Sequence, residues 1–329
     1  MTISIKKIFI FLLIVLFGMS CKEQQNTDLK PPRGYPNTFW LKAGYLMGQV
    51  KLVNLKPDVP PEIQEFKNLV YKTVDSDTLK LDIYQPANLT RPAPCLVFIH
   101  GGAWKGGNKQ DYLVYLLDFA KQGYITSTIS YRFSQQAHFP AAVLDVKCAI
   151  KWLKAHADEY GIDPDKMAVI GGSAGGHLAM MIGYTSDVAE FNGECEFDSV
   201  ECRVQAIVNL YGPTDLTTDF AKSKRVVHKF IGGKYDEAPE AYLSASPITH
   251  ISADDPPTLI FHGTIDDVVP VHQSDLLKAK LDELGVPNEY HRLKGWPHTM
   301  DAEASVNAYC QFYMNRFFRQ TIPFNNGEL

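Results

Sequence analysis

The sequence predicts an α/β protein built on a doubly wound, mostly parallel sheet. Short apolar runs such as residues 95–99 and 167–170 alternate with amphipathic stretches such as residues 140–160. Continuous apolar runs of strand length are typical of strands buried on both faces, and their alternation with helices favours parallel pairing. The chain has 329 residues, of which 45% are hydrophobic. That length suffices for one large domain or two small ones.

The N-terminus predicts export. Two lysines precede the apolar run 8–17, and Cys21 follows shortly after it. A charged start and a short apolar core are typical of a secretory signal, expected over residues 1–20 and too short to span a bilayer comfortably. The segment resembles a bacterial lipobox, which implies lipid attachment at Cys21 and a membrane-anchored lipoprotein, periplasmic or at the cell surface. Gly18 stands where leucine is usual, so a plain signal peptide or an uncleaved anchor remain alternatives.

A tether and N-terminal segment are expected over residues 21–65, with a short helix within 38–53. The main domain is expected over residues 66–320. It should open with an antiparallel hairpin at the sheet edge, made of strands at 69–74 and 79–84, because the second run alternates between apolar and polar residues.

The remaining elements follow from apolar runs, helical spacing and breaks at glycine. The expected strands are residues 95–99, 125–131, 167–170, 204–210, 258–261 and 289–293. The expected helices are residues 112–122, 140–160, 275–284 and 302–318. Residues 213–250 are irregular and richer in charge, and we expect them to form a small lid insertion over the site.

The most informative stretch reads MAVIGGSAGG, residues 167–176, and places Ser173 on a tight turn between a strand and a helix. The pattern G-x-S-x-G is typical of a nucleophile elbow, in which small neighbours permit a strained turn. A structural or phosphate-binding turn is the alternative. However, two required features are missing: the glycine at the third position of the dinucleotide pattern G-x-G-x-x-G, where Ser173 or Ala174 stands instead, and the Gly-Lys-Ser/Thr ending of a P-loop.

A serine nucleophile needs a base and an orienting carboxylate, and in a parallel sheet such residues follow the carboxyl ends of strands. His298 lies on a Gly/Pro loop after the last expected strand; the alternative is a polar residue at a helix start. Asp266 follows the preceding strand, with the adjacent Asp267 as the competing carboxylate. We expect His262 to shape that loop.

The stretch HGGAW, residues 100–104, follows the first central strand. Its glycines let backbone N–H groups approach a developing oxyanion, so we assign the oxyanion hole to the N–H groups of Gly102, Ala103 and Ala174. This chemistry implies no metal or organic cofactor. The net charge of −5 and the lack of a basic stripe exclude a nucleic-acid binder.

The order Ser173, Asp266, His298 matches the α/β-hydrolase order. The chain resembles α/β-hydrolase esterases of the hormone-sensitive-lipase-like type, and more closely the feruloyl/acetyl-esterase-like and "heroin esterase"-like bacterial branch. The lipase-like group usually has a third glycine where Ala103 stands, whereas HGG-x-W is usual in the feruloyl/acetyl branch and in kynurenine formamidases. The resembling segments are residues 100–104, 131–134, 139–153, 161–179, 211–216 and 262–270.

The resemblance implies a serine carboxylic-ester hydrolase acting on short acyl esters, such as acetyl or feruloyl groups on carbohydrates. An amide or peptide hydrolase, such as a formamidase, is the alternative within the same fold. A non-catalytic binding protein is the third interpretation, since fold alone does not guarantee activity. The oligomeric state is not predicted.

Export implies an oxidising compartment, where disulfides form. Cys195 and Cys202 bracket a polar loop and are the expected disulfide. Cys95 lies in an apolar strand run and Cys148 on an apolar helix face, so both are expected to be core thiols.

Overall fold

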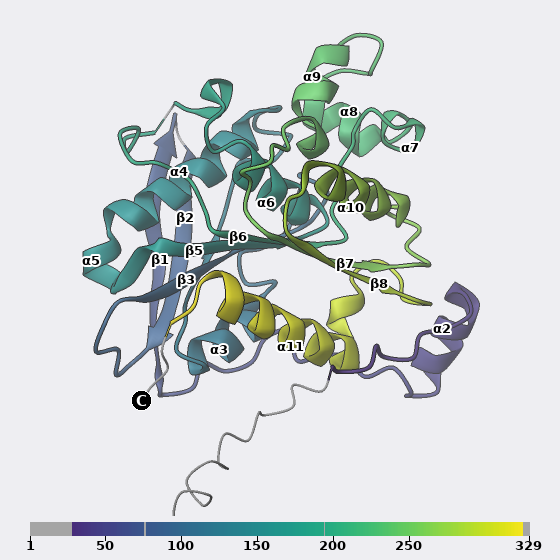
Figure 1. Cartoon of the computed structure of the whole chain (residues 1–329), viewed down its shortest axis with the longest axis horizontal. Coiled ribbons are helices and arrows are strands. Elements are labelled where there is room, and N and C mark those ends of the chain that lie inside the picture. The colour runs from purple at the N-terminus through teal and green to yellow at the C-terminus, as the bar shows by residue number, and fades with distance from the viewer. Residues whose placement is uncertain (1–27, 76, 194, 325–329) are drawn as a thin grey trace, which may run out of the picture. The chain divides into compact units, whose positions relative to one another are not determined.

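The protein is built on one central sheet with helices on both faces (Figure 1). This computed structural model describes residues 28–75, 77–193 and 195–324. Within them, the strands are β1 (Ile63–Val74), β2 (Asp77–Pro86), β3 (Ala93–Ile99), β4 (Ile125–Ile129), β5 (Ile162–Gly172), β6 (Ala206–Leu210), β7 (Thr258–Gly263) and β8 (Asn288–Leu293). Their order across the sheet is β1-β2-β4-β3-β5-β6-β7-β8.

The expected edge hairpin is confirmed. β1 and β2 pair antiparallel, and β2 pairs antiparallel with β4. Every pair from β4 through β3 to β8 is parallel. Parallel strands need crossover connections, which the intervening helices supply.

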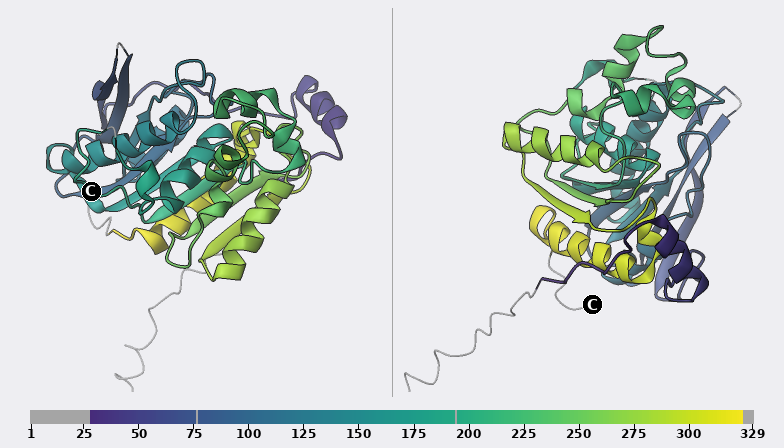
Figure 2. Two further views of the ribbon diagram at one scale, coloured as in Figure 1. Left: turned by 90° about the horizontal axis from the view of Figure 1, so that it is seen from above. Right: turned by 90° about the vertical axis from the view of Figure 1, so that its right-hand side faces the viewer.

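Most of the helices form two layers, one against each face of the sheet, whereas the N-terminal helix α2 lies outside both layers (Figure 2). The helices are α2 (Thr38–Leu46), α3 (Leu113–Lys121), α4 (Ala141–Ala155), α5 (Ala157–Tyr160), α6 (Ala174–Tyr184), α7 (Asp219–Lys222), α8 (Arg225–Ile231), α9 (Pro239–Ser244), α10 (His272–Leu284) and α11 (Ala304–Thr321), with short 3₁₀ turns at Ala189–Phe191, Pro247–Thr249 and Met300–Ala302.

Alternate residues of β3 enter opposite layers of the core. Cys95, Val97 and Ile99 belong to the core layer that also holds residues of α4, α6 and α10, whereas Leu96 and Phe98 belong to the layer that holds residues of α3 and α11. Successive strand side chains point to opposite faces, so a strand covered on both sides must be apolar throughout. This is why β3 is a continuous apolar run.

The expected single helix over residues 140–160 is divided into α4 and α5 at His156. There the backbone leaves helical geometry, and the His156 ring nitrogen Nδ1 lies 2.8 Å from the Trp152 carbonyl oxygen. The expected signal segment and Cys21 lie outside the described residues. No helix within the described ranges has both the length and the apolar character needed to cross a membrane.

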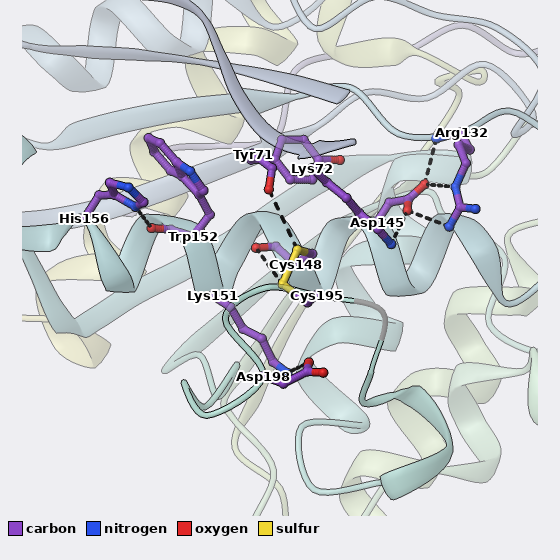
Figure 3. Close-up of a disulfide and its surroundings, with 10 residues drawn as sticks. All are labelled: Tyr71, Lys72, Arg132, Asp145, Cys148, Lys151, Trp152, His156, Cys195 and Asp198. Carbon is purple, nitrogen blue, oxygen red and sulfur yellow. Dashed lines mark hydrogen bonds and ion pairs between the residues drawn. A yellow bond between two sulfur atoms is a disulfide. The ribbon is translucent and has the colours of Figure 1, made fainter. Parts of the chain in front are cut away.

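The expected Cys195–Cys202 disulfide is wrong. Cys195 is bonded to Cys148 of α4 (Figure 3). Cys202 is a free, buried thiol. The two bonded residues have Cα atoms 5.5 Å apart. Cys148 has the helical spacing of a core residue, but α4 packs where the loop around Cys195 passes over it. That proximity is a tertiary contact, and sequence spacing does not report it.

Candidate active site

Ser173 occupies a strained turn between β5 and α6, with φ 55° and ψ −123°. The close approach of neighbouring backbone requires the flanking glycines. A Cβ on Gly171 would lie 2.2 Å from the Gly175 carbonyl oxygen, and one on Gly175 would lie 2.0 Å from the Ile99 oxygen. The Ser173 N–H donates to the Leu210 carbonyl at 2.9 Å. Surrounding structure therefore holds a conformation that a free chain would rarely adopt.

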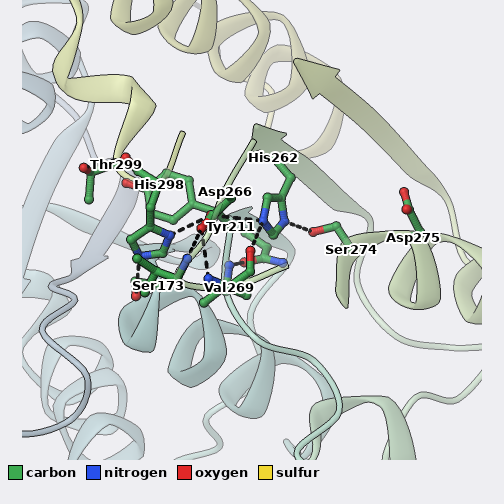
Figure 4. Close-up of polar contacts among 12 residues, drawn as sticks. Ser173, Tyr211, His262, Asp266, Val269, Ser274, Asp275, His298 and Thr299 are labelled. Atoms are coloured by element: carbon green, nitrogen blue, oxygen red, sulfur yellow. Dashed lines mark hydrogen bonds and ion pairs between the residues drawn. The ribbon is translucent and has the colours of Figure 1, made fainter. Parts of the chain in front are cut away.

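The three residues selected from strand ends meet in space (Figure 4). His298 Nε2 lies 2.9 Å from Ser173 Oγ, and His298 Nδ1 lies 2.7 Å from Asp266 Oδ2. Asp267 is exposed. The structure thus brings together Ser173, His298 and Asp266 and leaves the competing carboxylate outside.

Asp266 is an ionised acceptor. Its Oδ1 accepts from the N–H groups of Val268 and Val269, each at 2.9 Å. Burial alone would raise the pKa of Asp266, but hydrogen bonds from His262 and His298 outweigh it and lower the pKa to about 2. A carboxylate facing His298 Nδ1 assigns the proton to that nitrogen and leaves a lone pair on Nε2, directed at Ser173.

His262 supports the carboxylate from behind. Its Nε2 lies 2.9 Å from the Val269 carbonyl oxygen and 3.2 Å from Asp266 Oδ2, and its Nδ1 lies 2.7 Å from Ser274 Oγ. The ring is fully buried and links the Asp266 loop to the first turn of α10. Its contacts agree with the expected role in shaping this loop.

Ser173 and His298 border a cavity of about 540 Å³. Gly101, Gly102 and Ala103 line it on the side of the HGGAW loop. Ala174 begins α6 directly after Ser173. Of the two backbone segments predicted to form the oxyanion hole, the HGGAW loop therefore lines the cavity, and Ala174 directly follows the nucleophile that borders it.

The HGGAW loop is braced by aromatic contacts. The buried His100 ring stacks on Tyr131 with centroids 4.5 Å apart, and its Nδ1 lies 2.8 Å from the Gly101 oxygen. Trp104 donates from Nε1 to His177 Nδ1 at 3.3 Å and stacks on Phe230 of α8. Both contacts fix the loop beside Ser173.

The segment that borders the cavity differs from the one expected. Residues 213–250 form α7, α8 and α9, and Phe230 of α8 stacks on Trp104, but no described residue of this segment lines the cavity. Val53 and Leu55 of the N-terminal segment line it instead. The Val53 N–H donates to the Ala302 carbonyl at 2.9 Å, which ties that segment to the rim. Such a long-range backbone contact leaves no local sequence signal.

Two site residues were missed. Tyr211 directly follows β6, has φ 46°, and packs edge-on against the His298 ring at 4.7 Å. Its hydroxyl donates to Asp301. The signal that could have found Tyr211 is its position at a strand end, the same criterion that selected the three predicted residues. Asp301 lies only three residues after His298.

This sheet order, the elbow and the three-residue relay define the α/β-hydrolase class. The model of the family described as BD-FAE matches residues 81–281, so the chain belongs to the BD-FAE family.

Named relatives and solved structures agree with this class. A probable carboxylic ester hydrolase, LipM of Mycobacterium tuberculosis, is 38% identical over 237 residues, which is 69% of this chain and 54% of that protein. A truncated carbohydrate esterase from gut microbiota superposes with TM-score 0.72 at 28% identity, covering 79% of this chain and 97% of that one. A thermophilic esterase of Thermogutta terrifontis superposes with TM-score 0.69 at 27% identity, covering 85% and 100%. The chain spans about half the length of the curated relatives it matches.

Proposed function

We propose that this protein is a serine carboxylic-ester hydrolase with Ser173 as nucleophile, His298 as general base and acid, and Asp266 as orienting carboxylate. The observation that carries the proposal is the continuous relay from Ser173 Oγ through both His298 nitrogens to Asp266, at 2.9 and 2.7 Å. This is the hydrogen-bonded arrangement that activates a serine hydroxyl near neutral pH.

The reaction proceeds through an acyl-enzyme. His298 Nε2 takes the Ser173 proton as Oγ attacks the ester carbonyl, and the N–H groups of Gly102, Ala103 and Ala174 stabilise the oxyanion. His298 then gives the proton to the leaving alcohol as the C–O bond breaks. Water adds next, losing a proton to His298, and Ser173 regains it when the acid departs. Asp266 stabilises the imidazolium at both stages.

The proposed substrates are short acyl esters, such as acetyl or feruloyl groups on carbohydrates. Similarity to a protein titled a carbohydrate esterase supports this class. The cavity of about 540 Å³ has the size of a small-molecule site and is bordered by glycines and polar groups as well as apolar ones. A single fatty chain would favour a lining that is apolar throughout.

Probe labelling and hydrolysis test this function together. Wild type should react with a fluorophosphonate at Ser173 and hydrolyse p-nitrophenyl acetate, and Ser173→Ala should lose both. Ser223→Ala, at an exposed serine, is the matched control and should retain both. Labelling that persists in Ser173→Ala would refute the assignment. Acetylated and feruloylated oligosaccharides, with amides and N-formyl compounds alongside, then define the substrate class.

We further propose that the protein is an exported lipoprotein anchored through Cys21. The basis is the sequence alone: a charged start, a short apolar core and a cysteine after it. Metabolic labelling with a palmitate analogue should mark wild type and not Cys21→Ala. Label that survives the substitution, or wild type without label, would refute lipidation.

A further inference from the structure

The active-site cavity has one wall of polar side chains that the proposed mechanism does not use. Tyr112, Tyr115, Tyr211 and Asp301 line this side, and we name them the polar wall. They are 8%, 2%, 2% and 6% exposed, respectively. Burying phenols and a carboxyl costs free energy unless they are hydrogen-bonded. A cavity that held only an alkyl chain would gain more from leucine or phenylalanine at these positions.

Asp301 is the centre of the polar wall. The Tyr211 hydroxyl donates to its Oδ1, and the Asn307 side chain donates to its backbone oxygen at 2.9 Å. The buried Tyr115 hydroxyl lies close to the Asp301 carboxyl and to the Cys310 thiol, without a hydrogen bond of ordinary geometry to a described residue. The hydroxyls of the wall therefore gather around one carboxyl, that of Asp301, which itself lines the cavity.

The backbone beside the nucleophile accommodates these hydroxyls. A Cβ on Gly172 would lie 2.1 Å from the Tyr112 hydroxyl oxygen and 3.0 Å from that of Tyr211. Tyr211 itself adopts φ 46°, a conformation that is rare for a bulky residue. The missing side chain of Gly172 leaves space for the phenol oxygens next to Ser173. The strained backbone of Tyr211 holds one of these oxygens there. Strain of this kind persists where surrounding structure over-determines it, commonly at ligand sites.

We infer that the polar wall is a subsite for a hydroxyl group carried by the ester substrate. A hydroxyl both donates and accepts, so it can donate to the Asp301 carboxyl and accept from a phenol of the wall. An alkyl group in its place would leave those groups unpaired and desolvated. The inference rests on the proposed ester hydrolysis and specifies which esters are preferred.

The protonation behaviour of Asp301 favours a hydroxyl over an ammonium ligand. Burial raises the pKa of Asp301, although the hydrogen bond from Tyr211 opposes the rise. A carboxyl with a raised pKa can bond a hydroxyl in either protonation state. It attracts a cation only when ionised.

The hydroxyl can belong to the alcohol or to the acyl part of the ester, and two substrate pairs separate these sources. The alcohol arm compares 2-hydroxycyclohexyl acetate with cyclohexyl acetate. The acyl arm compares p-nitrophenyl 3-hydroxybutyrate with p-nitrophenyl butyrate. Wild type should favour the hydroxylated member of one pair by roughly ten- to a hundredfold in kcat/KM, mainly through KM.

Substitutions in the polar wall then test whether these residues cause the preference for hydroxylated substrates. Asp301→Asn and, independently, Tyr211→Phe should bring the hydroxyl preference close to one. Tyr309→Phe, at a buried tyrosine whose hydroxyl lies 2.8 Å from His291 Nδ1, and Asp267→Asn, at an exposed carboxylate, should keep the wild-type preference. Thermal unfolding checks that each variant folds. If Asp301→Asn does not fold, Tyr211→Phe by itself still tests the subsite.

Three results would overturn the inference. They are equal kcat/KM within both pairs, a preference unchanged in both wall variants, or stronger hydrolysis of 2-aminoethyl acetate than of 2-hydroxyethyl acetate. Hydrolysis of p-nitrophenyl acetate with probe labelling at Ser173, but without hydroxyl preference, refutes the subsite and leaves the proposed function standing. Absence of both hydrolysis and labelling refutes the proposed function and the subsite that rests on it.

Discussion

Asp266 Oδ2 lies 2.7 Å from His298 Nδ1, while the next residue, Asp267, faces solvent. One peptide unit therefore separates a carboxylate that orients the imidazole from one that does not. The difference is made by Val268 and Val269, whose N–H groups bind Asp266 Oδ1 and turn its second oxygen towards the ring.

Replacing these two carboxylates should have very different effects. Asp266→Asn should lower kcat by about 10⁴, because an amide can donate to His298 Nδ1 and favour the wrong tautomer. Asp267→Asn should remain within about twofold of wild type, as expected for a surface substitution. Steady-state hydrolysis of p-nitrophenyl acetate measures both. Equal losses in the two variants would contradict the assignment of Asp266.

Ser173 and His298 should act as one unit. Ser173→Ala and His298→Ala should each lower kcat on the order of a million-fold, and the double variant should be no slower than either. The reason is that a base without a nucleophile, or a nucleophile without a base, supplies almost none of the joint effect. Multiplicative losses in the double variant would show independent roles and contradict the relay.

The Cys148–Cys195 bond should stabilise the domain. It closes a loop of sequence separation 47, for which chain entropy predicts about 4 kcal/mol of unfolding free energy. Cys148→Ser and Cys195→Ser should each cost a similar amount, and the double variant little more. Urea denaturation measures this. Cys202→Ala is the control, and reducing agent should destabilise that variant as it does wild type. If reductant affects neither protein, the bond is not formed in solution.

His177 should make folding sensitive to mild acid. Burial lowers the pKa of His177 to about 4, with the nearby His250 adding to the effect and the Ala245 carbonyl opposing it. Between the usual pKa near 6.5 and about 4, the unfolded chain binds the extra proton, so stability falls as pH falls through this window. The loss approaches about 3 kcal/mol at its lower end.

His177→Gln should flatten this part of the stability profile, measured by urea denaturation at several pH values. His272→Gln, at an exposed histidine, should leave the profile unchanged. If the His177 variant loses as much stability as wild type between pH 6.5 and 4, the dependence arises elsewhere.

Gly172 and Tyr112 should be energetically coupled. Gly172→Ala places a Cβ 2.1 Å from the Tyr112 hydroxyl oxygen, so it should cost about 1–3 kcal/mol of stability through overpacking. Tyr112→Phe removes that oxygen and should restore part of the loss in the double variant. A double-mutant cycle by denaturation yields the coupling. Additive effects would mean that the hydroxyl does not occupy this space.

Most of the sheet could be predicted from the sequence because it depends on local patterns. The apolar run at 95–99 becomes β3, and the alternating run at 79–84 becomes part of the edge hairpin. The three residues of the relay were identifiable for a related reason. The carboxyl ends of parallel strands lie at the same edge of the sheet. Residues that directly follow different strands are therefore expected to lie close to one another.

Contacts between distant segments could not be predicted in this way. Cys148 looked like a core residue, and its bond to Cys195 depends on how a loop crosses α4. Val53 and Leu55 reach the cavity because the Val53 N–H pairs with the Ala302 carbonyl, a backbone bond that any side chain would permit. Neither contact changes the pattern of apolar and polar residues around the two residues that it joins.

The sequence by itself determined the fold class and the elbow with Ser173, because strand runs and obligatory glycines are local requirements of the backbone. It also narrowed the base and carboxylate to residues at strand ends. Only the tertiary structure decided between Asp266 and Asp267, paired Cys195 with Cys148, and assembled Tyr211 and Asp301 beside the nucleophile. Those outcomes depend on the direction of individual side chains and on packing between segments far apart in the chain.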